Sequence, residues 1–236
     1  MQAESGTNNM SESKLCPNKM IGLNNFYIEK MQMREINEIV NLLTDAFETN
    51  PVYSSIFNPT NLREGLIWLF ETDLFLLNRR QIVTKIVKEK NSNEIVGTLT
   101  LIPPSGTKRT FSDYRQAGLH KFIYRFGFSA LYRMLSLENY NKKILTKAVK
   151  SKEYDYLSMV AVKKEYKGKG IGSFAVKSCL NELRNTKTNG HLLGLTTQLP
   201  ENVSFYSRLG FEKIDEKEIF FNRKIHYYNC NMKYVF

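Results

Sequence analysis

Three glycines within five residues give the clearest chemical signal in the sequence. They lie in the segment YKGKGIGS (166–173), between an apolar run typical of a strand (156–162) and an amphipathic stretch typical of a helix (171–184). Glycines permit a sharp turn and a close approach of the backbone to a ligand. The first amides of a helix have no acceptor within the helix and attract anions. The segment predicts a pyrophosphate-binding turn, and its alternative is a glycine-rich turn without a ligand. Positive charge at this end comes from Lys163, Lys164, Lys167 and Lys169.

The spacing of these glycines argues against two common nucleotide sites. A P-loop requires a lysine directly after its last glycine, and Ser173 follows Gly172 here. A dinucleotide fingerprint requires G-x-G-x-x-G, whereas this segment has G-x-G-x-G and lies late in the chain. Hydrolysis of the P-loop type and binding of nicotinamide or flavin are therefore not expected.

A second segment, NVSFYSRLGF (202–211), carries polar groups at helical spacing. Asn202 and Tyr206 are four residues apart, which places them on one face of a helix. Gly210 is a typical residue just after a helix end. A phenol with an ordinary pKa near 10 keeps its proton at neutral pH and can donate it. Tyr206 is thus a polar group at the same helical face as Asn202 or a packing aromatic beside Phe205 and Phe211.

The order VAVKKEYKGKGIGS, then a strand, then NVSFYSRLGF resembles the GNAT acetyltransferase superfamily. The family's cofactor loop, Q/R-x-x-G-x-G/A, maps onto residues 167–172, with Lys167 in place of Gln or Arg. The resemblance covers about residues 26–236 and is specific over 157–211. It implies an α/β fold (an α+β three-layer domain) with a mixed, mostly antiparallel sheet flanked by helices on both faces.

The resemblance also implies a site and an activity. Enzymes of this family move an acetyl group from acetyl-CoA to an amine by direct attack in a ternary complex. The backbone of Val160, Ala161 and Val162 would pair with the pantetheine arm, and Asn202 would hydrogen-bond the amide region of the cofactor. Tyr206 would act as general acid on the CoA thiolate. The pyrophosphate would bind Lys167, Gly168, Lys169, Gly170, Ile171, Gly172 and Ser173.

The need for a general base depends on the acceptor. An amine attacks uncharged, and a lysine-type amine of pKa about 10.4 is neutral at pH 7 only about once in 2,500, which costs roughly 4.6 kcal/mol. An α-amino group near pKa 7.8 costs only about 1.1 kcal/mol. No base is assigned. The candidates for a base or a water relay, each alternatively a surface or capping group, are Glu71, Asp73, Asp155, Tyr156 and Ser158.

Hydrophobic periodicity and turn residues predict the elements that position these groups. The predicted strands cover 26–31, 156–162, 191–197, 211–220 and 226–235, with a β-hairpin formed by 81–90 and 94–104. The predicted helices cover 33–50, 61–78, 171–184 and 201–209. Residues 1–24 are expected to form a polar flexible leader, and 25–236 a single N-acetyltransferase-like domain.

The stretch 103–150 holds ten basic residues against two acids, Asp113 and Glu138, and so carries eight of the net eleven positive charges. We expect a basic helical insertion that walls the acceptor site. Its charge favours an acidic acceptor or help with the cofactor's phosphates, and the alternative is a solvated basic face. The basic residues are Lys108, Arg109, Arg115, Lys121, Arg125, Arg133, Lys142, Lys143, Lys147 and Lys150.

Composition limits the class of protein. The 236 residues are 42% hydrophobic, which excludes disorder over most of the length. The net charge of +11 favours an anionic partner. Three widely spaced cysteines form neither a disulfide framework nor a closed zinc site, and the separated histidines make a metal site unexpected. With no signal peptide and no run long enough to span a membrane, we expect a soluble cytoplasmic protein. These residues are Cys16, Cys179, Cys230, His120, His191 and His226.

Two rival functions stay open at this level. One is a non-catalytic acyl-CoA sensor on the same fold. The other is a nucleic-acid or membrane-surface binder that uses Lys108 to Lys150 with interleaved Phe and Tyr. The acceptor, a small-molecule or peptide amine, and the oligomeric state are not specified by the sequence.

Overall fold

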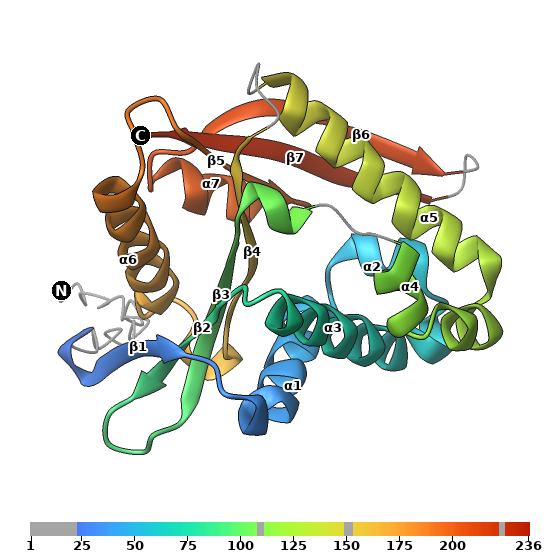
Figure 1. The fold of residues 1–236 in the computed structure, drawn as a ribbon, viewed down its shortest axis with the longest axis horizontal. Helices are drawn as coiled ribbons and strands as arrows, with labels where there is room; N and C mark the ends of the chain where they lie inside the picture. The colour runs from blue at the N-terminus through green and yellow to red at the C-terminus, as the bar shows by residue number, and fades with distance from the viewer. Residues whose placement is uncertain (1–22, 108–110, 149–152, 222–224) are drawn as a thin grey trace, which may run out of the picture.

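The computed structural model describes residues 23–107, 111–148, 153–221 and 225–236 (Figure 1). Nearly all of the expected leader, together with Cys16, Lys108, Arg109 and Lys150, lies outside these ranges. The strands are β1 (Phe26–Lys30), β2 (Thr84–Glu89), β3 (Ile95–Ile102), β4 (Asp155–Val162), β5 (Leu192–Thr197), β6 (Glu212–Phe221) and β7 (Ile225–Val235). The α-helices are α1 (Ile36–Phe47), α2 (Pro51–Ile56), α3 (Leu62–Arg79), α4 (Phe111–Gln116), α5 (Leu119–Ala148), α6 (Ile171–Thr186) and α7 (Pro200–Ser207).

The strands form one sheet in the order β1-β2-β3-β4-β5-β7-β6, and among the described residues only the β4–β5 pair is parallel. Successive residues of a strand face opposite sides, and the two cores follow this rule. Ile86 packs with α1 and α3, whereas its neighbour Val87 packs with α6. Helices therefore cover both faces, and the expected three-layer, mostly antiparallel fold is confirmed.

One helix was missed by the sequence analysis. The first helix ends at Phe47, three residues before the expected boundary at Asn50-Pro51, and this dipeptide begins α2. The Asn50 side-chain oxygen accepts a hydrogen bond from the Val52 amide at 3.1 Å, and proline occupies the first helical turn. Both are preferred features of a helix start.

The insertion is helical, as expected, and bends at a glycine. Gly127 has φ +84° inside α5 and divides it into two segments. The first segment is held by aromatic packing, with the Phe122 ring 4.6 Å from that of Trp68 and the Phe126 ring 5.2 Å from that of Phe57. The second segment runs beside β6 and β7 (Figure 1). The bend lets one helix contact both the α2–α3 layer and the far part of the sheet.

The only parallel pair opens after two residues. Asp155 lies opposite Leu193 and Tyr156 opposite Gly194, and no further pairing of β4 with β5 occurs. Directly afterwards β4 bulges, because Ser158 pairs with Thr100 and Ala161 with Thr98, so that two residues oppose one. Met159, one of the two residues that oppose Leu99 in the bulge, has φ +53°. A bulge increases local twist, and the β4 edge is thus left without a strand partner in the part of the chain that the structure describes.

A buried carboxylate holds the closed end of this opening. Asp155, only 1% exposed, starts β4 and lies 2.7 Å from His191 Nε2 and 3.1 Å from Lys187 Nζ. His191 directly precedes β5, and Lys187 directly follows α6. The Asp155 cluster therefore ties the start of β4 to the two elements beside it.

We expect Asp155→Ala to lower the free energy of unfolding by roughly 2–3 kcal/mol, because it leaves His191 and Lys187 without their buried anion. The matched control is Asp45→Ala. Asp45 pairs with Arg63 at 2.8 Å, but its side chain is 65% exposed, so the loss should stay below about 1 kcal/mol. Denaturant unfolding measures both variants, and equal losses would contradict this role of Asp155.

Candidate active site

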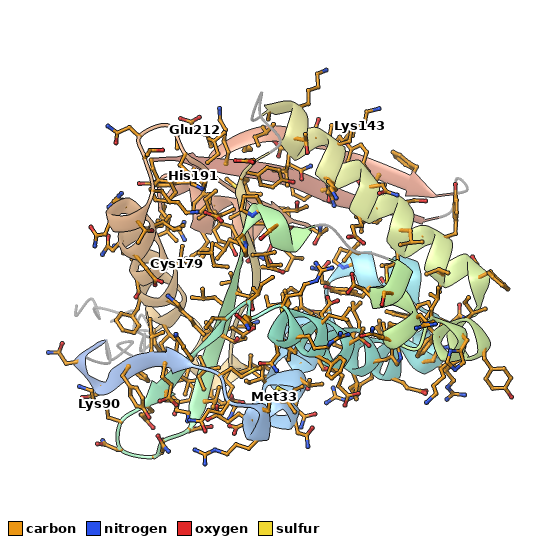
Figure 2. The ribbon with its side chains drawn as sticks, in the orientation of Figure 1. Met33, Lys90, Lys143, Cys179, His191 and Glu212 are labelled. Carbon is orange, nitrogen blue, oxygen red and sulfur yellow. The ribbon has the colours of Figure 1, made fainter. Side chains whose placement is uncertain are left out.

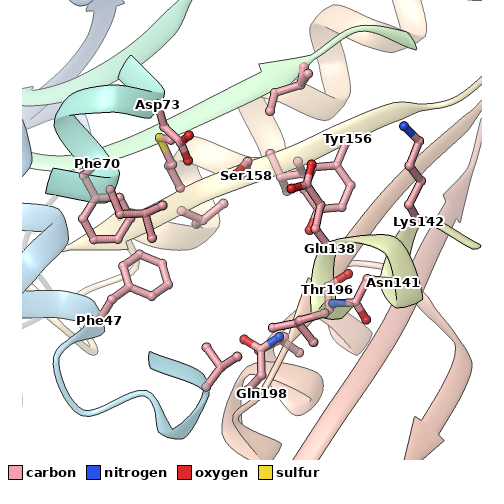
Figure 3. Close-up of a pocket in the computed structure, with 18 of the residues that line it drawn as sticks. Phe47, Phe70, Asp73, Glu138, Asn141, Lys142, Tyr156, Ser158, Thr196 and Gln198 are labelled. Atoms are coloured by element: carbon pink, nitrogen blue, oxygen red, sulfur yellow. The ribbon is translucent and has the colours of Figure 1, made fainter. Parts of the chain in front are cut away.

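A cavity of about 340 Å³ lies where β4 and β5 separate (Figure 3). Its floor is formed by β4 and the end of β5, and its walls by α2, α3, α5 and α7. Val160, Asn202 and Tyr206 all line it. The structure thus brings three of the sequence-predicted site residues, from β4 and α7, to one space.

The glycine turn follows β4 and leads into α6. Gly168 and Gly170 have φ +77° and +85°, a region that favours glycine. The first helical hydrogen bond runs from the Phe174 amide to the Gly170 carbonyl at 2.9 Å. The amides of Ile171, Gly172 and Ser173 precede it and have no acceptor within the helix. Since the Ile171 side chain is buried in the core, its backbone is what this residue can offer to an anion.

The turn is anchored to the β2–β3 hairpin. Lys163 Nζ lies 2.6 Å from Glu94, and the Tyr166 hydroxyl donates to Glu94 at 3.0 Å. Burial, followed by the hydrogen bond to Glu94, raises the pKa of Tyr166 to about 12. The Glu94 carboxylate therefore compensates the positive charge of Lys163. Lys167 is exposed at the turn, and Lys169 Nζ lies 4.9 Å from the centre of the Tyr166 ring.

The remaining predicted strand residues lie at the open edge of β4. Val160 lines the cavity, while Ala161 and Val162 pair with Thr98 and Gly97 of β3 on their other side. A strand paired on one side only still presents amides and carbonyls on the other. An extended ligand can therefore add to this edge.

Tyr206 both packs and opens to the cavity. Its ring lies edge-on to Phe205 and Phe211, with centroids 4.9 and 5.5 Å away, and the residue is 8% exposed. No described residue hydrogen-bonds its hydroxyl. Burial raises the pKa of Tyr206 well above its ordinary value, so the phenol keeps its proton. Asn202, one turn earlier, donates to Thr197 Oγ1 at 3.2 Å.

The candidate bases separate into two groups. Asp73, Tyr156 and Ser158 line the cavity (Figure 3). Glu71 is exposed and does not line it, and Asp155 belongs to the closed end described above. Burial raises the pKa of Tyr156, which is hydrogen-bonded to Thr196. Only the first group is placed to meet a ligand in the cavity.

Sequence reasoning missed Glu138, which lines the cavity beside Tyr156 (Figure 3). Its carboxylate has no hydrogen-bond or ion-pair partner among the described residues. The available signal was its isolation, since it is one of only two acids in a strongly basic stretch. Asn141 and Lys142, three and four residues later, line the same cavity, as helical spacing requires.

A chain of buried amides fixes α5 to the sheet, and sequence patterns gave no sign of it. Asn229 and Asn231, both fully buried on β7, donate to Asn141 Oδ1 of α5 at 2.9 and 3.3 Å. Gln198 donates to Asn229 at 3.1 Å and accepts from Asn50 at 3.3 Å. Buried polar groups that find partners specify a unique arrangement. The chain therefore sets the position of the α5 face that carries Glu138.

The basic residues of the insertion point mainly away from the cavity. Lys142 is the one that lines it among those described. Arg125 pairs with Glu64 at 2.6 Å, and Lys143 is exposed on α5 (Figure 2). The second segment of α5 thus forms one wall of the cavity, without concentrating the charge of the insertion there.

Cys179 lies outside this site. It is buried in α6, where burial raises the pKa of its thiol to about 11.

In the described ranges no three His, Cys, Asp or Glu side chains gather as metal ligands would. The same ranges contain no helix long and apolar enough to cross a membrane.

Comparisons with known proteins give the family. A model described as "Acetyltransferase (GNAT) domain" matches residues 109–233, more than half of the chain. No curated protein matches the sequence.

Solved structures share the fold at low identity. A histone acetyltransferase HPA2 and related acetyltransferase from Corynebacterium glutamicum has 16% identity and a TM-score of 0.57 over 89% of this chain and 95% of that one. Arylalkylamine N-acetyltransferase 2 from Aedes aegypti has 13% identity and a TM-score of 0.61 over 90% of this chain and 99% of that one. The putative acetyltransferase yncA from Salmonella typhimurium, with its cofactor acetyl-CoA, has 14% identity and a TM-score of 0.50 over 89% of this chain and 94% of that one.

Proposed function

The chain belongs to the GNAT acetyltransferase family, and we propose that it transfers an acetyl group from acetyl-CoA to an amine by direct attack in a ternary complex. One observation carries the proposal. The cavity at the opening between β4 and β5 holds a buried, protonated Tyr206 and Glu138, which has no hydrogen-bond or ion-pair partner among the described residues, and β4, which forms its floor, leads into the glycine turn. That arrangement offers a strand edge and a turn for a cofactor, with a proton donor and a proton acceptor in the adjoining cavity.

The residues of the glycine turn and of the open β4 edge fit coenzyme A. The amides of Ile171, Gly172 and Ser173 and the side chain of Lys167 suit a pyrophosphate, since a helix N-terminus favours an anion. The open edge of Val160–Val162 suits the amides of the pantetheine arm, and Asn202 lies beside its path. Gly168, Lys169 and Gly170 complete the turn that brings these donors to one point.

Two side chains handle the protons of the transfer. The amine nitrogen forms a bond to the acetyl carbon while the carbon–sulfur bond breaks. Tyr206 gives its phenolic proton to the departing thiolate, and Glu138 takes the proton that the amine loses. An N-acetylated product and CoA thiol leave, and proton exchange with water restores both side chains.

Cofactor binding is tested by Gly170→Glu, with Gly190→Glu as its control. Both glycines have φ +85°, so both variants carry similar backbone strain, but Gly190 lies beyond the end of α6. At a hundredfold excess over Kd, acetyl-CoA should stabilise the wild type and the control by about 2.7 kcal/mol, or roughly 5–11 °C in Tm. Gly170→Glu should lose the shift. A shift retained there would remove the turn from the site.

The acid role is tested by Tyr206→Phe. We expect kcat to fall by roughly 10²-fold or more while acetyl-CoA binding stays within twofold, because the variant lacks the hydroxyl that donates the proton and keeps the ring. Tyr234→Phe, outside the cavity, should keep full activity. Since burial raises the pKa of Tyr206, the wild-type rate should not decline as pH rises through 10, the ordinary phenol pKa. A wild type that binds acetyl-CoA without any turnover would instead indicate a sensor.

The base role is tested by Glu138→Gln at two pH values with an amine of pKa about 10.4. At pH 7 we expect kcat/KM to fall by about 10²-fold, because the amine then lacks its proton acceptor. Near pH 10 a large share of the amine is already neutral, so most of the deficit should disappear. Glu218→Gln on exposed β6 is the control. An equal deficit at both pH values would exclude Glu138 as the base.

A further inference from the structure

Three aromatic rings from three different helices form one end of the cavity. Phe47 ends α1, Tyr53 lies in α2 and Phe70 lies in α3, and all three line the cavity. The ring centroids are 5.9 Å apart for Phe47–Tyr53, 5.5 Å for Phe47–Phe70 and 6.1 Å for Tyr53–Phe70. We call these residues the aromatic wall. Figure 3 shows Phe47 and Phe70 together at this end, away from Asn141 and Lys142.

The surroundings of the aromatic wall are apolar. Val52 and Ile56, on either side of Tyr53 in α2, line the cavity, and so does Leu69, next to Phe70 in α3. No described residue hydrogen-bonds the Tyr53 hydroxyl, although it borders the cavity. Apolar surface of this kind gains free energy when a ligand replaces water on it. A ligand made only of charged and polar groups would not use it.

The lining carboxylate without a hydrogen-bond or ion-pair partner among the described residues is Glu138, and it favours a cation over an anion. Among the described lining residues the carboxylates are Asp73, Asp113 and Glu138, and the cations are Arg80 and Lys142. Arg80 and Asp113 form an ion pair with each other. Burial, and after it the charge of Asp73, raises the pKa of Tyr53, because the Asp73 carboxylate lies near the aromatic wall. This arrangement argues against the acidic acceptor that the basic insertion suggested from sequence.

We propose that the acceptor is a small primary amine whose body is an aromatic ring. The ring lies on the wall of Phe47, Tyr53 and Phe70, and the amino group points toward Glu138 and Ser158. A cavity of about 340 Å³ is of the size that holds small ligands. The inference rests on the proposed acetyl transfer and names its substrate class.

The first test compares four acceptors by release of the CoA thiol from acetyl-CoA. 2-Phenylethylamine should exceed butylamine in kcat/KM by about tenfold or more, because the ring buries more apolar area at the aromatic wall. Putrescine, with a second charge and no ring, and glutamate, with carboxylates, should be poorer than butylamine. Equal or better rates with butylamine, putrescine or glutamate would overturn the proposed class.

A variant tests whether the aromatic wall causes the preference. Phe47→Leu keeps an apolar side chain and removes a ring, so the ratio of kcat/KM for 2-phenylethylamine over butylamine should fall roughly three- to tenfold. Phe75→Leu is the control, since Phe75 lies on α3, is 43% exposed and does not line the cavity. General damage to the fold would lower both amines together and leave the ratio unchanged. An unchanged ratio in Phe47→Leu overturns the role of the wall.

The acetyl-CoA thermal shift, measured on the same samples, distinguishes failure of the proposed substrate class from failure of the proposed acetyl transfer. Acetyl-CoA binding and turnover without a preference for the aromatic amine would overturn the substrate class and leave acetyl transfer standing. Absence of both binding and turnover would overturn acetyl transfer and the substrate class with it.

Discussion

The separation of β4 from β5 is the constraint on which the rest of the site depends. Two paired residues, held by the Asp155 cluster, keep the strands together at one end. The bulge at Met159 and Val160 then turns β4 away. A continuous parallel pair would bury the backbone that an extended ligand needs, and Tyr206 would lose its open space. The sheet thus gives up several ladder hydrogen bonds at its centre, and the two cores on its faces supply the stability that tolerates this.

The walls around the opening come from elements that are distant in the chain. The side proposed for a cofactor is bordered by α7 and by β4, which leads into the glycine turn, while α1, α2, α3 and α5 line the side proposed for an acceptor. The bend at Gly127 lets the insertion contribute to both the helical layer and the cavity. In the proposed function, cofactor and acceptor therefore bind to different parts of the chain, and the acceptor side can change without disturbing the glycine turn.

Local patterns predicted what is locally determined. Strand alternation, the glycine turn and the Asn202–Tyr206 spacing each depend on a few neighbouring residues, and the observed elements follow them closely. Asp155 and Glu138 show the limit. Each is one acid among many in the sequence, and only tertiary contacts make Asp155 an anchor and leave Glu138 open to the cavity. The aromatic wall is harder still, because its three rings meet only after three helices have packed.

The chain of amides beneath α5 has a consequence for how the molecule responds to its solvent. Asn50, Gln198, Asn229, Asn231 and Asn141 neither gain nor lose protons in the physiological range and carry no net charge. A set of ion pairs in this place would weaken in concentrated electrolyte and would respond to acidification. The chain of amides does neither. Variation in acidity or ionic strength therefore leaves the contact of α5 with β7 in place, whereas the Asp155 cluster, which pairs with Lys187 and His191, is open to both.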